Sequence, residues 1–206
     1  MKKKLIIFDL DGVLLDSEEN MRLSWKSVMK KYNIKKDFLM YRKYIGLPFQ
    51  EILLKLKITK KNKEIEQTYN DSSIKYFNSF KLFQGVKKTL AHINKNYFTA
   101  IITSKHKKRT NLIIKKNKLK IKTVITPQDN CRVKPYPDSI FKVMRIYNIK
   151  NKKDVIYVGD TKIDLKMSTN AKVNYIQANY GFFKLNIKNK INNFLEMHSV
   201  LKKINF

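Results

Sequence analysis

The sequence has little cysteine, glycine, proline or tryptophan: one, five, four and one residues among 206. The single cysteine, Cys131, excludes an internal disulfide and is typical of a reducing compartment. No apolar run approaches the roughly 18 residues that a membrane-spanning helix needs. The apolar run near the N-terminus is cut by Asp9 and Asp11 and lacks a small-residue cleavage site, so we expect no secretion signal. We therefore expect a cytoplasmic protein that does not associate with membranes.

Acidic residues are also scarce, with 16 against 45 basic residues, which gives a formal net charge of +29. A field of this sign attracts polyanions, so nucleic-acid binding is one hypothesis. Only five of the basic residues are arginine, although arginine is the side chain that nucleic-acid readers favour for bidentate contacts. Because lysine is spread along the whole chain, we interpret the charge as a lysine-coated surface that reflects A/T-rich codons. We expect no specific nucleic-acid partner, and we expect the field to attract small anionic substrates.

Two carboxylates follow the first apolar run, which reads Lys4-Leu5-Ile6-Ile7-Phe8-Asp9-Leu10-Asp11-Gly12-Val13. The run predicts a buried strand, and side chains two positions apart on a strand point to the same side. Asp9 and Asp11 would then face together, where mutual repulsion and burial require compensation. A divalent cation with oxygen ligands is the simplest compensation, and Gly12 permits a tight turn beside it. The twelve-residue calcium-loop pattern with its terminal glutamate is missing, so we do not interpret the stretch as a calcium loop.

The region from Leu14 to about Phe83 is poor in glycine and proline and shows no strand-like alternation. Apolar residues at helical spacing follow Glu18, and further helices are predicted over residues 50–56 and 64–80. We interpret residues 15–82 as an inserted α-helical segment.

Helices and strands alternate from residue 83 onward. Strands are predicted at 97–103, 121–125, 155–158 and 173–177, and helices at 86–94, 106–117, 138–147, 162–170 and 187–203. This alternation predicts a parallel sheet with right-handed crossovers. We therefore expect an α/β fold with a Rossmann-like parallel sheet core, formed by residues 1–14 and 83–206.

Polar side chains follow four of the predicted strands. They are Asp9 and Asp11 after the first strand, Thr103 and Ser104 after the second, Lys134 past the third, and Asp160 and Asp164 after the fourth. The carboxyl ends of parallel strands meet at one edge of a sheet, so we expect these side chains to gather there. Carboxylates with an open coordination position suit Mg2+, and a hydroxyl with an ammonium suits phosphate oxygens.

Four segments together resemble the motifs of the haloacid dehalogenase superfamily, in its phosphatase branch with a helical cap. The segments are Phe8-Asp9-Leu10-Asp11-Gly12-Val13-Leu14-Leu15-Asp16-Ser17, Ile101-Ile102-Thr103-Ser104-Lys105, Lys134-Pro135-Tyr136-Pro137-Asp138 and Gly159-Asp160-Thr161-Lys162-Ile163-Asp164. Any one motif is a weak signal, but four in this order at strand ends form a specific one. The resemblance covers nearly the whole chain, and it implies that the helical insert at residues 15–82 is a cap domain.

The resemblance implies Mg2+-dependent hydrolysis of a small phosphate monoester, phosphoglycolate-like or a sugar phosphate, through an aspartyl-phosphate. Asp9 would be the nucleophile, and Asp11 the general acid and then the general base. The Asp9 carboxylate, the Asp11 backbone carbonyl and the Asp160 carboxylate would hold Mg2+. Asp164 would orient water or ligands from the outer shell. The implied partner is a small phosphorylated metabolite, and the implied assembly a monomer or a homodimer.

The resemblance also assigns the phosphate-binding side chains. Thr103, Ser104 and Lys134 would bind the phosphoryl oxygens, and Lys134 would also hold Asp9 ionised.

The sequence departs from the family pattern at three positions. Val133 stands where relatives often have glycine, Met21 where mutases carry a histidine, and Phe49 where we align the mutase cap arginine. The segment 46–51 is more similar to the cap of phosphoglycolate and pyrophosphate phosphatases. These departures favour hydrolysis. A β-phosphoglucomutase-like phosphomutase, an inorganic pyrophosphatase, and a nucleic-acid-binding protein on an inactive phosphatase scaffold stay open as alternatives.

Other candidate side chains have a simpler interpretation. Lys105 and His106 could form a substrate-side pair, but we expect them to be exposed loop residues. We expect the aromatic residues Trp25, Tyr32 and Tyr44 to belong to the core of the insert.

Overall fold

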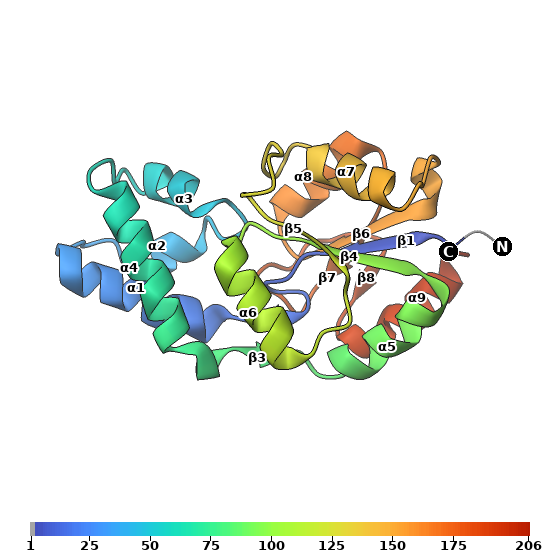
Figure 1. Cartoon of the computed structure of the whole chain (residues 1–206), viewed down its shortest axis with the longest axis horizontal. Helices are drawn as coiled ribbons and strands as arrows, with labels where there is room; N and C mark the ends of the chain where they lie inside the picture. Colours follow the sequence, from blue (N-terminus) through green and yellow to red (C-terminus); the bar gives the residue numbers. More distant parts are fainter. Residues whose placement is uncertain (1–2) are drawn as a thin grey trace.

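The first apolar run forms strand β1 (Leu5–Phe8), all four residues of which are buried. The computed structural model describes residues 3–206. It places β1 between β4 (Phe98–Ile102) and β6 (Val155–Gly159) in a sheet of order β5-β4-β1-β6-β7-β8 (Figure 1). The outer strands are β5 (Thr123–Ile125), β7 (Asn174–Ala178) and β8 (Lys190–Ile191). Every pairing in this sheet is parallel, which confirms the predicted α/β fold.

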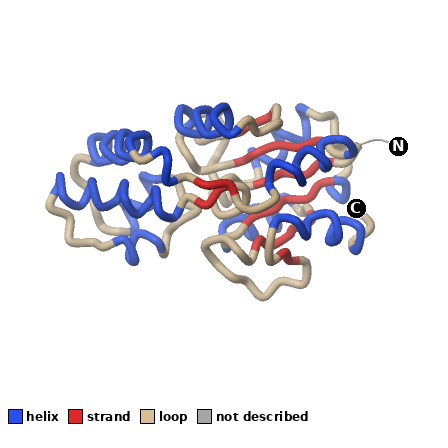
Figure 2. The backbone as a smooth tube through the Cα atoms, turned by 90° about the horizontal axis from the view of Figure 1, so that it is seen from below, coloured by secondary structure: helices blue, strands red, loops and turns tan. Residues whose placement is uncertain are grey.

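Helices cover both faces of the sheet because successive strand side chains point to opposite sides. Ile6 and Phe8 of β1 contribute to one apolar cluster, and Leu5 and Ile7 contribute to the other. Residues of α5 (Val86–Asn96), α6 (Lys107–Asn117) and α9 (Met197–Lys203) complete the first cluster. Residues of α7 (Asp138–Ile146) and α8 (Lys162–Ala171) complete the second. Figure 2 shows the strands lying among these helices.

Four helices lie beside the sheet, at the left of Figure 1, and we call them the helical group. They are α1 (Glu18–Tyr32), α2 (Phe38–Arg42), α3 (Phe49–Lys55) and α4 (Asn62–Lys75). The group has its own apolar cluster, which includes Trp25 and, from the loop after β7, Phe182. Strands β2 (Leu15–Asp16) and β3 (Lys81–Leu82) pair antiparallel where the chain leaves for the group and returns from it. The division into domains at residues 15 and 82 stays a prediction.

The predicted helix over 187–203 is wrong in its first half. The chain there forms β8, which pairs with β7, then the 3-10 turn Phe194–Glu196 and only then α9. The carboxylate of Glu196 accepts hydrogen bonds from the Asn192 backbone N–H at 2.9 Å and from Asn193 Nδ2 at 2.8 Å. Asn193 has an extended backbone, and Glu196 bonds to both asparagines before the turn, so the helix begins ten residues later than predicted. Two further 3-10 turns span Phe77–Ser79 and Lys152–Asp154.

Candidate active site

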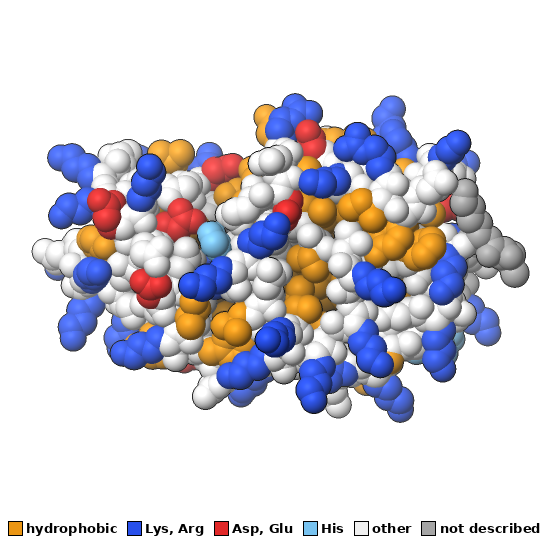
Figure 3. All heavy atoms as spheres, in the orientation of Figure 1, with side chains coloured by type: hydrophobic (Ala, Val, Ile, Leu, Met, Phe, Trp, Pro, Cys, Tyr) orange, Lys and Arg blue, Asp and Glu red, His pale blue; other side chains and the backbone are white. Residues whose placement is uncertain are grey.

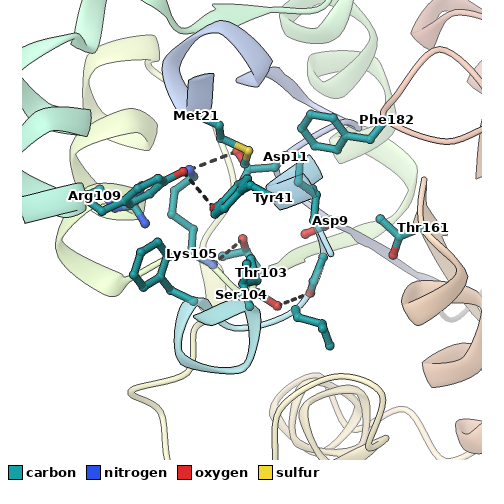
Figure 4. A pocket seen from close by; sticks show the side chains of 16 residues that line it. Asp9, Asp11, Met21, Tyr41, Thr103, Ser104, Lys105, Arg109, Thr161 and Phe182 are labelled. Atoms are coloured by element: carbon teal, nitrogen blue, oxygen red, sulfur yellow. Dashed lines mark hydrogen bonds and ion pairs between the residues drawn. The ribbon is translucent and has the colours of Figure 1, made fainter. Parts of the chain in front are cut away.

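The carboxyl edge of the sheet brings the predicted polar side chains together. Asp9, Asp11, Thr103 and Ser104 line a cavity of about 50 Å³ between the sheet and the helical group (Figure 4). The side chains of Lys134, Asp160 and Asp164 are buried beside Asp9. The parallel topology therefore gathers all seven predicted site residues in one region, as the strand-end argument requires.

Asp9 presents one occupied and one open carboxylate oxygen. Its Oδ1 accepts hydrogen bonds from the Leu10 backbone N–H at 2.7 Å and pairs with Lys134 Nζ at 2.9 Å. Within residues 3–206, no group donates a hydrogen bond to Asp9 Oδ2. Burial raises the pKa of Asp9 to about 7. The positive charge of Lys134 lowers this pKa, while the negative charges of Asp164 and Asp11 raise it further. The open oxygen is therefore available to a cation or to an electrophile.

Lys134 links two carboxylates across the site. Its Nζ lies 2.9 Å from Asp9 Oδ1 and 2.8 Å from Asp164 Oδ1. Burial acts to lower the pKa of Lys134, but the carboxylates of Asp164 and Asp9 outweigh it and hold the pKa above its ordinary value. Lys134 therefore stays charged and orients Asp9.

Asp164 has donors on both oxygens. Oδ1 accepts from Lys134 Nζ and from Tyr157 Oη at 3.1 Å, and Oδ2 accepts from the backbone N–H and hydroxyl of Thr161 at 3.1 and 2.6 Å. Thr161 in turn accepts from the Asp164 backbone N–H, so the two residues form a capping box at the start of α8. Because its oxygens are occupied, Asp164 is suited to positioning Lys134 rather than to binding a cation directly.

Asp160 is the carboxylate that fits a metal ion. Its side chain is fully buried, Oδ2 accepts from the Phe182 backbone N–H at 2.7 Å, and Oδ1 has no hydrogen-bond partner among the described residues. Oxygens of Asp9, Asp160 and Asp164 lie within 4.8 Å of one another. Burial, with the charges of Asp164 and Asp9, raises the pKa of Asp160 well above its ordinary value. A divalent cation would compensate this repulsion, so the residues present fit Mg2+.

Two glycines leave free the space that the Asp160 side chain occupies. Gly12 has φ +78°, and a Cβ there would lie 2.2 Å from Asp160 Oδ2. A Cβ on Gly181 would lie 2.5 Å from the Asp160 Cβ. No side chain larger than hydrogen fits at either position without displacing the carboxylate.

Lys105 is not an exposed loop residue, so that prediction is wrong. The residue is 4% exposed, and its Nζ lies 3.1 Å from Asp11 Oδ1 and 5.1 Å from the centre of the Phe80 ring. Burial lowers the pKa of Lys105 to about 8, while Asp11 opposes the shift and Arg109 adds to it. The counter-charge of Asp11 is what permits burial of this lysine.

Three neighbouring polar residues form hydrogen bonds in or beside the second motif, residues 101–105. The Thr103 hydroxyl accepts from the Lys105 backbone N–H at 3.1 Å and lines the cavity. The Ser104 hydroxyl donates to the Gly46 carbonyl at 2.7 Å, so it ties this motif to the helical group. His106 is partly exposed and caps α6 through Nδ1, which accepts from the Lys108 backbone N–H at 3.3 Å.

The helical group supplies an aromatic wall that the sequence analysis did not assign to the site. Tyr41 and Tyr69 line the cavity, and the Tyr41 hydroxyl donates to that of Tyr69 at 3.1 Å. Met21 and Phe49, where the mutase residues were sought, line the same wall and are buried.

Arg109 of α6 also lines the cavity and was missed. Two features of the sequence could have indicated it: arginine is rare in this chain, and this one follows Lys105 by four residues at the start of a predicted helix.

Basic side chains are dispersed over the face drawn in Figure 3, across the helical group and the part of the chain around the sheet alike. The absence of a specific nucleic-acid partner stays a prediction. Within residues 3–206, the helices are all too short or too polar to cross a bilayer.

Similar proteins cover nearly the whole chain. Pyrophosphatase PpaX of Oceanobacillus iheyensis is 25% identical, with 84% of this chain and 82% of the relative covered. Phosphoglycolate phosphatase of Pasteurella multocida is 25% identical, with 87% of each covered.

Solved structures show the same fold. A hydrolase from Pseudomonas syringae has a TM-score of 0.87 at 21% identity, with 98% of this chain and 99% of that chain covered. A haloacid dehalogenase-like family hydrolase from Streptococcus pneumoniae has a TM-score of 0.81 at 18% identity, with 96% and 98% covered.

The model of one protein family, described as haloacid dehalogenase-like hydrolase, matches residues 6–178. This match spans β1 to β7 and includes all seven predicted site residues. It confirms the predicted family and, with it, the enzyme class of haloacid dehalogenase-type phosphatases. The chain belongs to the haloacid dehalogenase-like hydrolase family.

Proposed function

We propose that the protein hydrolyses a small phosphate monoester in a Mg2+-dependent reaction through an aspartyl-phosphate on Asp9. The observation that carries the proposal is the buried carboxylate pair Asp9 and Asp160, each with an oxygen that has no hydrogen bond from residues 3–206. Lys134 lies against Asp9, and Asp9 opens onto the cavity. An anionic nucleophile and a cation site at one cavity wall suit phosphoryl transfer.

In the first step, Asp9 Oδ2 attacks phosphorus, and the bond between phosphorus and the ester oxygen breaks. Asp11, which must gain a proton when the substrate binds, donates it to that leaving oxygen, which departs as the alcohol. Lys134 holds the other Asp9 oxygen, so the attacking oxygen keeps its direction toward the cavity.

In the second step, Asp11 takes a proton from water, and the resulting hydroxide attacks phosphorus. The bond between phosphorus and Asp9 breaks, which releases phosphate and restores the Asp9 carboxylate. One residue thus donates a proton in the first step and accepts one in the second.

Mg2+ would be held by the carboxylates of Asp9 and Asp160 and the backbone carbonyl of Asp11, and would neutralise charge on the nucleophile and the phosphoryl group. Thr103, with its hydroxyl at the cavity, would bind a phosphoryl oxygen together with Lys134. Ser104 would contribute through its backbone N–H, because its hydroxyl is bonded to Gly46.

The named relatives favour the smaller of the candidate substrates. The relatives are named as a pyrophosphatase and a phosphoglycolate phosphatase, and both names indicate compact substrates. We propose a phosphoglycolate-like substrate, with residues 15–82 acting as the cap that closes the cavity.

A phosphate-release screen tests this function. The protein is incubated with some tens of phosphorylated metabolites, pyrophosphate included, in Mg2+ and in excess EDTA. We expect release from small phosphate monoesters in Mg2+ alone, and none from the Asp9→Asn variant. Equal release in EDTA, or none from any compound, would reject the proposal.

A further inference from the structure

Arg109 is a buried cation that contacts the cavity. The residue is 7% exposed, comes from α6 and lines the same cavity as Asp9. Figure 4 shows Arg109 and Asp9 on opposite sides of that cavity. A group bound at Arg109 would therefore share the cavity with a phosphoryl group at Asp9.

Arg109 has no carboxylate partner among residues 3–206. Its Nη1 donates to Ser73 Oγ at 3.1 Å, its guanidinium lies 5.3 Å from the Tyr69 ring centre, and its Nε is buried without an acceptor. The other two buried cations of the site are paired, Lys105 with Asp11 and Lys134 with Asp9 and Asp164. A buried charge without a counter-charge is costly, so a ligand that brings the negative charge would relieve it.

The neighbours of Arg109 hold it in one orientation. The Ser73 hydroxyl donates to Asn20 Oδ1 at 2.6 Å, which leaves its oxygen to accept from Arg109. Asn20 Nδ2 donates to the Ser73 carbonyl at 3.0 Å, so Asn20 of α1 fixes Ser73 of α4 through two hydrogen bonds. A guanidinium fixed in this way offers its remaining N–H groups as a planar fork, which matches the oxygens of a carboxylate or a phosphate.

We propose that Arg109 selects substrates that carry a second anionic group, a carboxylate or a phosphate, a few atoms from the reacting phosphorus. This inference rests on the proposed hydrolysis at Asp9 and assigns its substrate class. Because Arg109 and Asp9 line the same cavity, one substrate that contacts both must carry its two anionic groups within that cavity, and Tyr41 and Tyr69 line its wall. A neutral ester of the same size leaves Arg109 uncompensated and binds less well.

The competing role for Arg109 is a strut between α6 and α4. Its bond to Ser73 and its position over Tyr69 join these two helices. Loss of a strut would impair every substrate alike, whereas loss of an anion site impairs only substrates with the second anion.

The test compares three substrates in Mg2+. Phosphoglycolate carries a carboxylate, pyrophosphate carries a second phosphate, and 2-hydroxyethyl phosphate replaces the carboxylate with a neutral hydroxymethyl group. The variants are Arg109→Gln and Arg109→Lys, with Arg145→Gln as the matched control because Arg145 is exposed on α7. Thermal unfolding is measured for each variant, and Arg109→Lys serves where the glutamine variant does not fold.

We expect the wild type to prefer at least one anionic substrate over 2-hydroxyethyl phosphate. In Arg109→Gln, kcat/KM for that substrate should fall on the order of 10- to 100-fold, mostly through KM, as loss of charge-assisted hydrogen bonds predicts. For the neutral ester, kcat/KM of Arg109→Gln should change less than about threefold. Arg109→Lys should retain part of the preference for the anionic substrate. Arg145→Gln should have the same kcat/KM values as the wild type.

Three results would overturn the inference. The wild type could show no preference for either anionic substrate, kcat/KM of Arg109→Gln could fall equally for all three substrates, or it could fall for none of them. Mg2+-dependent hydrolysis of the neutral ester in those cases would leave the proposed function intact. If the wild type hydrolyses none of the three, the proposed function fails and the inference fails with it.

Discussion

The ammonium nitrogen of Lys105 lies 3.1 Å from Oδ1 of Asp11, and both side chains are buried at the cavity wall. Asp11 is the residue we propose as general acid and general base, and its ion pair with Lys105 holds the Asp11 carboxyl group at the cavity wall. The pair also explains why a lysine with a long flexible stem is buried here.

Lys105→Met should lower kcat on the order of tenfold to a hundredfold, because Asp11 loses the partner that orients it. The methionine keeps most of the buried stem volume, so the fold should persist. Steady-state phosphate release measures the effect. Lys107→Met is the matched control, since Lys107 is half exposed and its pair with Asp129 is of the surface kind that contributes little. An unchanged kcat in Lys105→Met would show that Asp11 does not depend on this pair.

Asp160→Asn should remove most of the activity, by about a hundredfold or more, because it removes a proposed Mg2+ ligand. The variant should unfold at the same temperature as the wild type in EDTA or slightly higher, since repulsion within the carboxylate cluster is relieved. Asp71→Asn, an exposed change on α4, is the control. Activity at the wild-type level in Asp160→Asn would show that the reaction does not depend on a metal ion held by Asp160.

Stability without metal should fall as the pH rises from about 4 to 7. Burial raises the pKa of Asp9 from 3.8 to about 7, so across that interval the folded state binds more protons than the unfolded state. Mg2+ should therefore raise the melting temperature more at pH 8 than at pH 5. Melting curves with Mg2+ and with EDTA measure both effects, and Asp9→Asn should weaken the pH dependence. If Mg2+ raised the melting temperature equally at pH 5 and at pH 8, the idea that Mg2+ compensates the charge of the Asp9 cluster would be contradicted.

The reaction should be hydrolysis rather than transfer between sugar positions. Met21 cannot gate Asp11 with a hydrogen bond, and Phe49 packs its ring 4.6 Å from that of Tyr69 instead of offering a charge. Incubation with β-glucose 1-phosphate and Mg2+, followed for phosphate and glucose 6-phosphate, decides the matter. Glucose 6-phosphate accumulating without phosphate release would show a mutase.

The positions of Asp9, Asp160 and Lys134 were predictable because a parallel sheet places the ends of its strands at one edge. The strands were predictable from apolar runs such as 155–158. Asp9 and Asp160 come directly after such runs, whereas Lys134 comes nine residues after β5. The parallel topology was therefore enough to predict that these side chains lie at one edge of the sheet.

The roles of Lys105, Tyr69 and Arg109 were not predictable in the same way. Their burial depends on how the helical group packs against α6, which no local pattern of residues specifies. The 187–203 helix failed for a related reason, because pairing of β8 with β7 overrode the helical spacing of apolar residues.

The most direct test of the account is the site of covalent phosphate. The radiolabelled substrate that releases most phosphate in the screen is mixed with the protein, quenched in acid within a turnover, and the labelled peptide is identified by mass. We predict phosphate on Asp9, and no labelled protein in Asp9→Asn, which should remain folded by its melting curve. A covalent phosphate on any other residue, or turnover by Asp9→Asn at the wild-type rate, would contradict the proposal.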